Sequence, residues 1–268
     1  MAKLTRRTFL KSMGWGAAAA VGTLAYGDTT SKQVELVERE LVLPNWTADG
    51  FKIAVIADPH MDSPEATERA RKAIQDLFAK KPDAMVFVGD FLTSAHPTIL
   101  ENVRSSLALV NDAPCPCFGI LGNHDYWAGW FQLVMGTLTS SKMSLLRNQT
   151  LEVQGVRICG LDDGLMNNHK PEAAKADKNT VVLLHEPDYV KDLAKGPSLQ
   201  ISGHSHGGQI CLPGGASIHT PKGARKFISG FYPENHIPVY VSRGVGTTGP
   251  NWRLFCPPEA TILTLRGA

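Results

Sequence analysis

The heptapeptide GHSHGGQ, residues 203–209, places two histidines one residue apart among three glycines. His204 and His206 fit a catalytic pair, two ligands for a metal ion, or two polar residues on a surface turn. In an extended segment, residues i and i+2 point to the same side, so both imidazoles can face one crevice. The heptapeptide alone does not distinguish these interpretations.

Other potential metal ligands follow apolar runs along the chain. Each run has the length of a buried strand and leads into carboxylate, imidazole or amide side chains. These side chains are Asp58 and His60 after run 51–57, Asp90 after 84–89, Asn123, His124 and Asp125 after 117–122, His185 at the end of 180–185, and His204 and His206 after 198–203. Loops at the carboxyl ends of strands gather in one crevice of an open sheet, so we expect these side chains to converge.

Oxygen and nitrogen ligands without cysteine select Mn²⁺, Zn²⁺ or iron over a thiolate-bound structural zinc. One ion rarely needs seven ligands, and a central aspartate can bridge two ions. Two ions about 3.5–4 Å apart are the standard device for in-line displacement at phosphorus. Each short motif alone also fits a turn or a structural histidine, but their shared position after apolar runs favours a metal centre.

The elements that must position these residues alternate early in the chain. A helix is predicted from Pro64 to about Phe78, with Ser63 as its cap, and weaker helical patterns span 97–110 and 187–193. Further strands are predicted at 156–160, 239–242 and 261–265. Helices separate the early strands, whereas the late strands follow one another closely. This order predicts stacked sheets flanked by helices in one domain over 51–268, preceded by a lead-in segment over 28–50.

With these motifs in order, the chain resembles the calcineurin-like metallophosphoesterase family. The matching motifs are DPH at 58–60, GD at 89–90, GNHD at 122–125, His185 and GHSH at 203–206. GLDD at 160–163, GHSHGGQICLP at 203–213, YVSRGVGTTG at 240–249 and CPPE at 256–259 resemble a branch of exported or membrane-associated phosphodiesterases. The resemblance implies an α/β fold, a β-sandwich flanked by helices in α/β/β/α layers, with a dinuclear site at one end.

The resemblance also implies roles for individual residues. The first ion would take Asp58, His60, Asp90 and His206, and the second Asp90, Asn123, His185 and His204. A hydroxide bridging the two divalent ions, with Mn²⁺ favoured and Fe²⁺ or Zn²⁺ as alternatives, would attack phosphorus. His124 would serve as general acid or charge stabiliser, and Asp125 would orient His124.

Substrate contacts are less specific. Arg225 and Arg243 are candidates for steering an anionic substrate, as are Lys222, Lys226 and Arg253, and solvated surface charge is the alternative for all five. The aromatic residues Trp127, Trp130 and Phe131 follow GNHD. They either line an apolar substrate groove or pack a helix onto the sandwich.

The leading functional interpretation is a phosphodiesterase acting on a lipid, cell-envelope or small-molecule phosphodiester. A pyrophosphatase of a nucleotide-linked lipid precursor, such as a UDP-diacylglucosamine-like compound, is the enzymatic alternative, because branch relatives include such activities. A non-catalytic metal-binding envelope protein is the third, and the intact ligand set with His124 argues against it.

The N-terminus predicts export. Residues 1–27 contain Lys3, Arg6, Arg7 and Lys11 with no acid, followed by an apolar stretch rich in Gly and Ala, which resembles a twin-arginine signal peptide. That route implies the twin-arginine machinery as a partner, a periplasmic or envelope location, and peripheral membrane association. Removing these four cations from 27 leaves 23 basic against 25 acidic residues, which argues against nucleic-acid binding.

Overall fold

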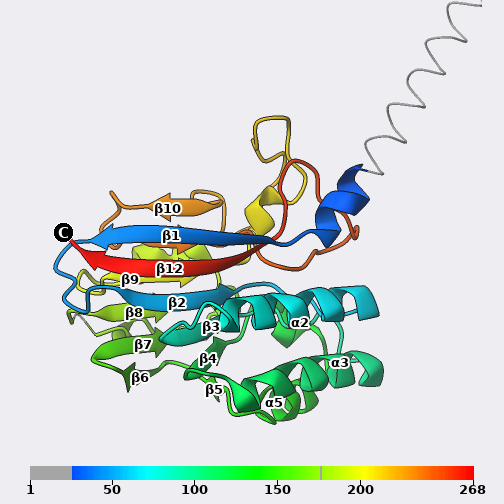
Figure 1. The fold of residues 1–268 in the computed structure, drawn as a ribbon, viewed down its shortest axis with the longest axis horizontal. Coiled ribbons are helices and arrows are strands. Elements are labelled where there is room, and N and C mark those ends of the chain that lie inside the picture. Colours follow the sequence, from blue (N-terminus) through cyan, green and yellow to red (C-terminus); the bar gives the residue numbers. More distant parts are fainter. Residues whose placement is uncertain (1–25, 176) are drawn as a thin grey trace, which may run out of the picture.

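The computed structural model describes residues 26–175 and 177–268, which form two packed six-stranded sheets (Figure 1). The first sheet has the order β1-β12-β2-β3-β4-β5 and the second β10-β11-β9-β8-β7-β6. The first sheet contains β1 (Glu35–Leu43), β2 (Phe51–Ile56), β3 (Ala84–Val88), β4 (Cys117–Ile120), β5 (Ser144–Leu145) and β12 (Glu259–Gly267). The second contains β6 (Gln149–Val153), β7 (Val156–Gly160), β8 (Thr180–Leu183), β9 (Leu199–Ser202), β10 (Gly230–Tyr232) and β11 (Val239–Val241).

Both sheets are mixed. Strands β2, β3, β4 and β5 run parallel, while β12 is antiparallel to β2 and parallel to β1. In the second sheet β7, β8, β9 and β11 are parallel, and the edge strands β6 and β10 are antiparallel to their neighbours. The carboxyl ends of the parallel strands in each sheet therefore lie side by side, at the same end of the strands.

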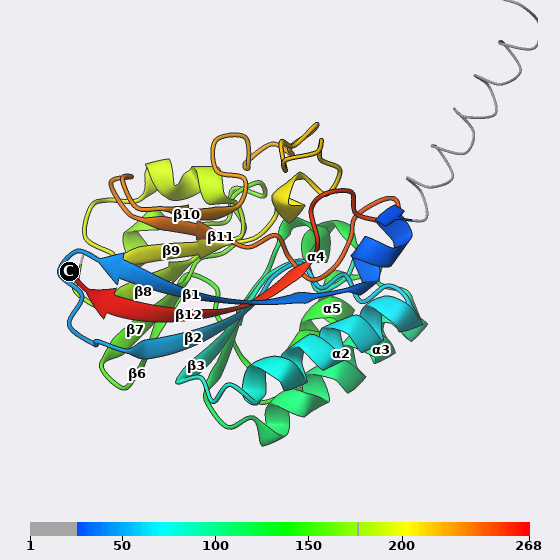
Figure 2. The same ribbon diagram turned by 45° about the horizontal axis from the view of Figure 1, so that its top comes forward.

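Helices cover the outer face of the first sheet, as Figures 1 and 2 show. They are α2 (Pro64–Phe78), α3 (Pro97–Leu107) and α5 (Phe131–Leu138), and a short helix α4 (Asn123–Trp127) follows β4. The 3₁₀ turns are η1 (Ala108–Asp112), η2 (Pro171–Ala173), η3 (Pro187–Asp192) and η4 (His206–Gly208). The prediction for the first helix is confirmed, with the Ser63 hydroxyl accepting the amide of Ala66 at 3.2 Å.

Successive side chains of a buried strand point to opposite faces of its sheet and so belong to different apolar layers. In β3, Met85 and Phe87 pack against the helices, whereas Val86 and Val88 face the second sheet. A third cluster lies on the outer face of the second sheet and includes Val190 of η3. The α/β architecture of two sheets with flanking elements is thus the predicted one, and residues 187–193 form 3₁₀ turns where a helix was predicted.

The lead-in segment is part of the sheet, which differs from the boundary predicted at residue 51. Its strand β1 pairs with β12 over nine residues, from Glu35 opposite Glu259 to Leu43 opposite Gly267. Most β1 side chains are exposed, and only Leu41 and Leu43 are buried, as expected for a charged edge strand. No sequence pattern predicted β5, β6, β10, α4 and α5.

The predicted signal peptide lies outside the described residues except for its last two. Among the described residues, no helix is long and apolar enough to cross a membrane. All five cysteines are free thiols, and four of them are buried.

Candidate metal centre

Seven buried side chains converge where strands of both sheets end. Asp58 and His60 follow β2, Asp90 follows β3, Asn123 begins α4 after β4, His185 follows β8, and His204 and His206 follow β9. Each is at most 7% exposed. The structure therefore brings together all seven residues predicted to bind metal, four from the first sheet and three from the second.

The backbone at the centre is strained. Five of the seven residues have positive φ angles: Asp58 (48°), His60 (40°), Asp90 (56°), His204 (67°) and His206 (50°). Residues other than glycine rarely adopt this conformation, which costs on the order of 1–3 kcal/mol each. Such strain persists only where the surrounding structure enforces it. Here the strained backbone directs the side chains of the candidate ligands toward the centre.

Glycines in the motifs allow close approach of backbone to carboxylates. A Cβ atom at Gly203 would collide with the carboxylate of Asp58, and one at Gly122 with that of Asp90. The glycine at each position therefore leaves the space that the neighbouring carboxylate occupies.

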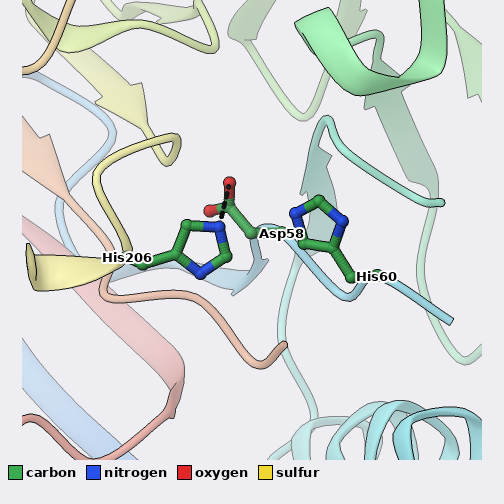
Figure 3. A group of neighbouring side chains, drawn as sticks. All are labelled: Asp58, His60 and His206. Atoms are coloured by element: carbon green, nitrogen blue, oxygen red, sulfur yellow. Dashed lines mark ion pairs between the residues drawn. The ribbon is translucent and has the colours of Figure 1, made fainter. Parts of the chain in front are cut away.

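One group consists of Asp58, His60 and His206, whose ligand atoms lie within 4.8 Å of one another (Figure 3). His206 Nε2 is 3.8 Å from Asp58 Oδ1, and the rings of His60 and His206 stack at 5.2 Å. His60 Nδ1 lies 2.9 Å from the Thr93 hydroxyl, which itself donates to Asp62. Since Thr93 donates elsewhere, Nδ1 carries the proton and Nε2 presents a lone pair to the centre.

A second group consists of Asp90, His185 and His204, also within 4.8 Å. His185 Nδ1 donates to the carbonyl of Val88 at 2.7 Å, and His204 Nε2 donates to the carbonyl of Lys222 at 2.9 Å. Because a carbonyl only accepts, each of these two nitrogens carries a proton, and the other nitrogen of each ring is the potential ligand atom.

Asp90 lies between the two groups. Its Oδ2 is 3.1 Å from His185 Nε2 and 3.6 Å from His60 Nε2, so one oxygen faces both groups. Its Oδ1 accepts the backbone amide of His124 at 2.9 Å. The burial of Asp90 opposes ionisation, but the imidazoles of His185 and His60 outweigh it and lower the pKa of this carboxyl.

Two buried atoms show that the site suits cations. Among the described residues, Asn123 Oδ1 and His185 Nε2 have no hydrogen-bond partner. The nearest group to His185 Nε2 is an Asp90 oxygen at 3.1 Å. Burial disfavours the charged ring, but Asp90 outweighs it and raises the pKa of His185, so a bound cation would take the place of a proton on Nε2. A buried acceptor without a donor is costly, and a divalent cation would satisfy the Asn123 oxygen together with the carboxylates.

The sequence comparison agrees with this geometry. The family model for calcineurin-like phosphoesterases matches residues 51–208, a range that holds all seven residues. The chain belongs to the calcineurin-like phosphoesterase family. It is 31% identical to YkuE of Bacillus subtilis, named as an uncharacterised metallophosphoesterase, over 99% of each chain.

Two other relatives of this phosphoesterase carry more specific names. It is 29% identical to the phosphodiesterase YaeI of Escherichia coli, over 98% of this chain and 99% of the relative. It is 27% identical to the UDP-2,3-diacylglucosamine pyrophosphatase LpxG of Chlamydia muridarum, over 80% of this chain and 83% of the relative.

The two predicted catalytic residues of the phosphoesterase have different environments. His124 lines the pocket above the centre, with its ring 5.1 Å from that of His60 and 5.3 Å from that of Trp127. Asp125 does not orient that ring, which corrects the sequence-based expectation. Its buried oxygens accept the amides of Asp90, Phe91 and Gly122 at 2.9–3.0 Å. Asp125 therefore ties the start of α4 to the loop that carries Asp90.

Neither arginine assigned to substrate lines the pocket. Arg243 donates to Glu259 and Glu35, and the backbone of Arg225 is held by the Asp188 carboxylate. Neither residue is among those that line the pocket, so a contact of either arginine with substrate stays a prediction. Of the other cations considered, Lys222 lines the pocket.

Arg253 is a structural residue. It is fully buried and donates to the carbonyls of Arg243, Gly244, Gly246, His206 and Cys256. It therefore joins the turn of η4 to the C-terminal loop and is not available to an anionic substrate.

The aromatic residues after GNHD have separate roles. Trp127 lines the pocket and is 58% exposed, whereas the Phe131 ring stacks on that of Tyr126 at 4.7 Å. Trp130 is 65% exposed and is not one of the residues lining the pocket. Trp127 thus lies where the groove interpretation requires, its contact with substrate stays a prediction, and the packing interpretation holds for Phe131.

Thr248 also lies at the centre, although no sequence motif marks it. Its hydroxyl lies 3.1 Å from His60 Nε2 and 3.0 Å from His206 Nε2, and Gln209 holds its backbone through two hydrogen bonds. The only signal in the sequence was its place in a glycine-rich loop.

Proposed function

We propose that this phosphoester hydrolase is a phosphodiesterase that works with two divalent cations. The observation that carries the proposal is the pair of ligand groups meeting at Asp90, with the Asn123 amide oxygen unpartnered and His185 Nε2 3.1 Å from Asp90 Oδ2. Asp58, His60, Asp90 and His206 would hold one cation, and Asp90, Asn123, His185 and His204 the other. When bound, the two cations supply Lewis acidity and lower the pKa of a coordinated water.

The chain's own residues would then orient the phosphoester and handle its leaving group. His124 faces the pocket beside His60, and its backbone is fixed by Asp90. From there its ring would donate a proton or a hydrogen bond to the leaving oxygen. Lys222 on the pocket wall adds positive charge for an anionic substrate.

A diphosphate is the second candidate substrate. The pocket of about 740 Å³ has room beyond a single phosphoryl group, and the relative LpxG is named as a pyrophosphatase of a nucleotide-linked lipid. The ligand set, with oxygen and imidazole nitrogen donors, favours Mn²⁺ and also accepts Fe²⁺ or Zn²⁺.

The test loads the purified protein with Mn²⁺, Fe²⁺, Zn²⁺ or Mg²⁺ and compares a phosphomonoester, a phosphodiester and a diphosphate. We expect the diester to be hydrolysed fastest. His124→Ala should lower kcat by about 10²–10⁴-fold while both metals remain bound. Faster turnover of the diphosphate would favour the second candidate, and no turnover with any metal would leave a non-catalytic metal-binding protein.

We also propose export by the twin-arginine route, on the basis of Arg6 and Arg7 before a Gly- and Ala-rich apolar stretch. The protein would then act in the periplasm or at the cell envelope. Replacing both arginines by lysine should leave the protein in the cytoplasmic fraction. Continued export of the double variant would contradict this route.

A further inference from the structure

The pocket over the metal centre has two unlike halves. Its floor consists of metal-ligand candidates and His124, whereas its walls are mainly apolar. The apolar lining residues are Trp127, Leu165, Ile210, Ile218, Pro221 and Pro250. A phosphoryl group needs only the floor, so the walls indicate an additional apolar part of the substrate.

The walls come from separate segments. Trp127 ends α4, while Ile210, Ile218 and Pro221 belong to the loop after η4, and Figure 2 shows this loop projecting beyond the strands. Trp127 and Ile218 are 58% and 61% exposed. Leaving two large apolar side chains in water forfeits the favourable free energy of burial, which a bound apolar chain would restore.

The apolar wall starts at the reacting end of the pocket. The Trp127 ring contacts the His124 ring edge-on at 5.3 Å. An apolar chain lying on Trp127 would therefore be attached close to the phosphoryl group, as in an ester of a long-chain alcohol or a phospholipid.

The charges around the pocket fit an anionic head and not an acidic or polar tail. Lys222 and His219 lie in the same wall, and Asp90 is the only acidic residue among those lining the pocket. Among the remaining polar residues, the Thr248 hydroxyl lies against His60 and His206, and Gln209 holds the backbone of Thr248.

We propose that this pocket binds the hydrocarbon chain of an amphiphilic phosphoester, with Trp127 on one wall and Ile218 on another. The inference rests on the proposed function and names its substrate class. The occupant is a single hydrocarbon chain of the substrate itself, held while its phosphoryl group lies on the floor.

The experiment compares 4-nitrophenyl methyl phosphate with 4-nitrophenyl dodecyl phosphate, both below the micelle-forming concentration, on the Mn²⁺-loaded protein. Each buried methylene contributes up to about fourfold to affinity, so we expect kcat/KM to be at least about tenfold higher for the dodecyl ester. Ile218→Ser and Trp127→Ala should each lower that ratio several-fold. The control Leu151→Ser, at an exposed apolar position on β6, should keep the ratio of the unmodified protein.

Equal kcat/KM values for the two esters would overturn the inference, as would a ratio that Ile218→Ser and Trp127→Ala leave unchanged. A preference that arises only above the micelle-forming concentration would indicate binding to a lipid surface and would also overturn it.

A binding measurement separates this inference from the proposed function. Calorimetry with dodecylphosphonate and methylphosphonate needs no turnover. Tighter binding of the dodecyl compound without hydrolysis of either ester would support the chain site and contradict the proposed function. Hydrolysis of both esters with equal binding of the two phosphonates would support the proposed function and contradict the hydrocarbon-chain site.

Discussion

The proton positions of three histidines are set by partners outside the centre. One ring nitrogen of each histidine donates a hydrogen bond to a fixed acceptor: His60 to the Thr93 hydroxyl, His185 to the carbonyl of Val88, and His204 to the carbonyl of Lys222. Such outer hydrogen bonds orient ligating imidazoles and choose the nitrogen that faces the metal. The arrangement therefore prepares a binding site before any cation arrives.

Metal binding should depend on pH through Asp58. Burial raises the pKa of Asp58 to about 7, although His185 opposes the shift, whereas burial lowers the pKa of His60 to about 4. A cation needs the ionised carboxylate, so below pH 7 loading must also release the Asp58 proton, and affinity should fall by about tenfold per pH unit more steeply than above pH 7. Neutral His60 releases none at this pH.

Calorimetry in buffers with different ionisation enthalpies measures this release. We expect up to about one more proton per chain to be released at pH 6 than at pH 8. Asp58→Asn should remove that difference, although it also weakens binding. Equal release at both pH values by the unmodified protein would contradict the assignment.

The convergence of the seven candidate ligands could be predicted because each follows an apolar run, but the residues that support them could not. Asp125 was taken for a partner of His124, and its real partners are backbone amides of residues 90, 91 and 122. Thr248 and Arg253 also act through contacts with distant segments, which no local pattern encodes.

At the scale of elements, the loops that carry the ligands are joined by buried polar side chains. Asp125 joins the β3 loop to α4, and Arg253 joins η4 to the loop after β11. The Arg253 guanidinium donates hydrogen bonds to five backbone carbonyls. Removing the guanidinium would leave several of these buried acceptors without donors.

Arg253→Met should therefore lower the free energy of unfolding by about 3 kcal/mol or more. For a chain of this size that corresponds to roughly 6–12 °C in Tm, measured by circular dichroism. The matched control is Arg266→Met, since Arg266 forms exposed ion pairs with Glu40 and Asp49 and its replacement should change Tm little. Similar changes in both variants would contradict the structural role of Arg253.

At the scale of the whole molecule, each ligand group combines residues from both sheets. Asp58 and His60 of the first sheet meet His206 of the second, and Asp90 of the first meets His185 and His204 of the second. The apolar layer between the sheets therefore positions the centre. Metal binding should in turn stabilise the packing of the two sheets.

The layered fold could be predicted from strand and helix patterns, whereas β1, the edge strand of the first sheet, could not. The β1 segment is charged and mostly exposed, so no apolar run marks it. Only pairing with β12, more than 200 positions later in the chain, makes Glu35–Leu43 a strand. The domain thus begins before residue 51.

The most direct test of the central claim is the number of metal ions per chain. Elemental analysis of Mn²⁺-loaded protein should give about two ions, and Asp90→Ala, which removes the residue shared by both groups, should give at most about one and abolish hydrolysis of a phosphodiester. His96→Ala, an exposed histidine at the start of α3, should keep both ions and activity. A single ion in the unmodified protein, or two ions and full activity in Asp90→Ala, would contradict a dinuclear centre built around Asp90.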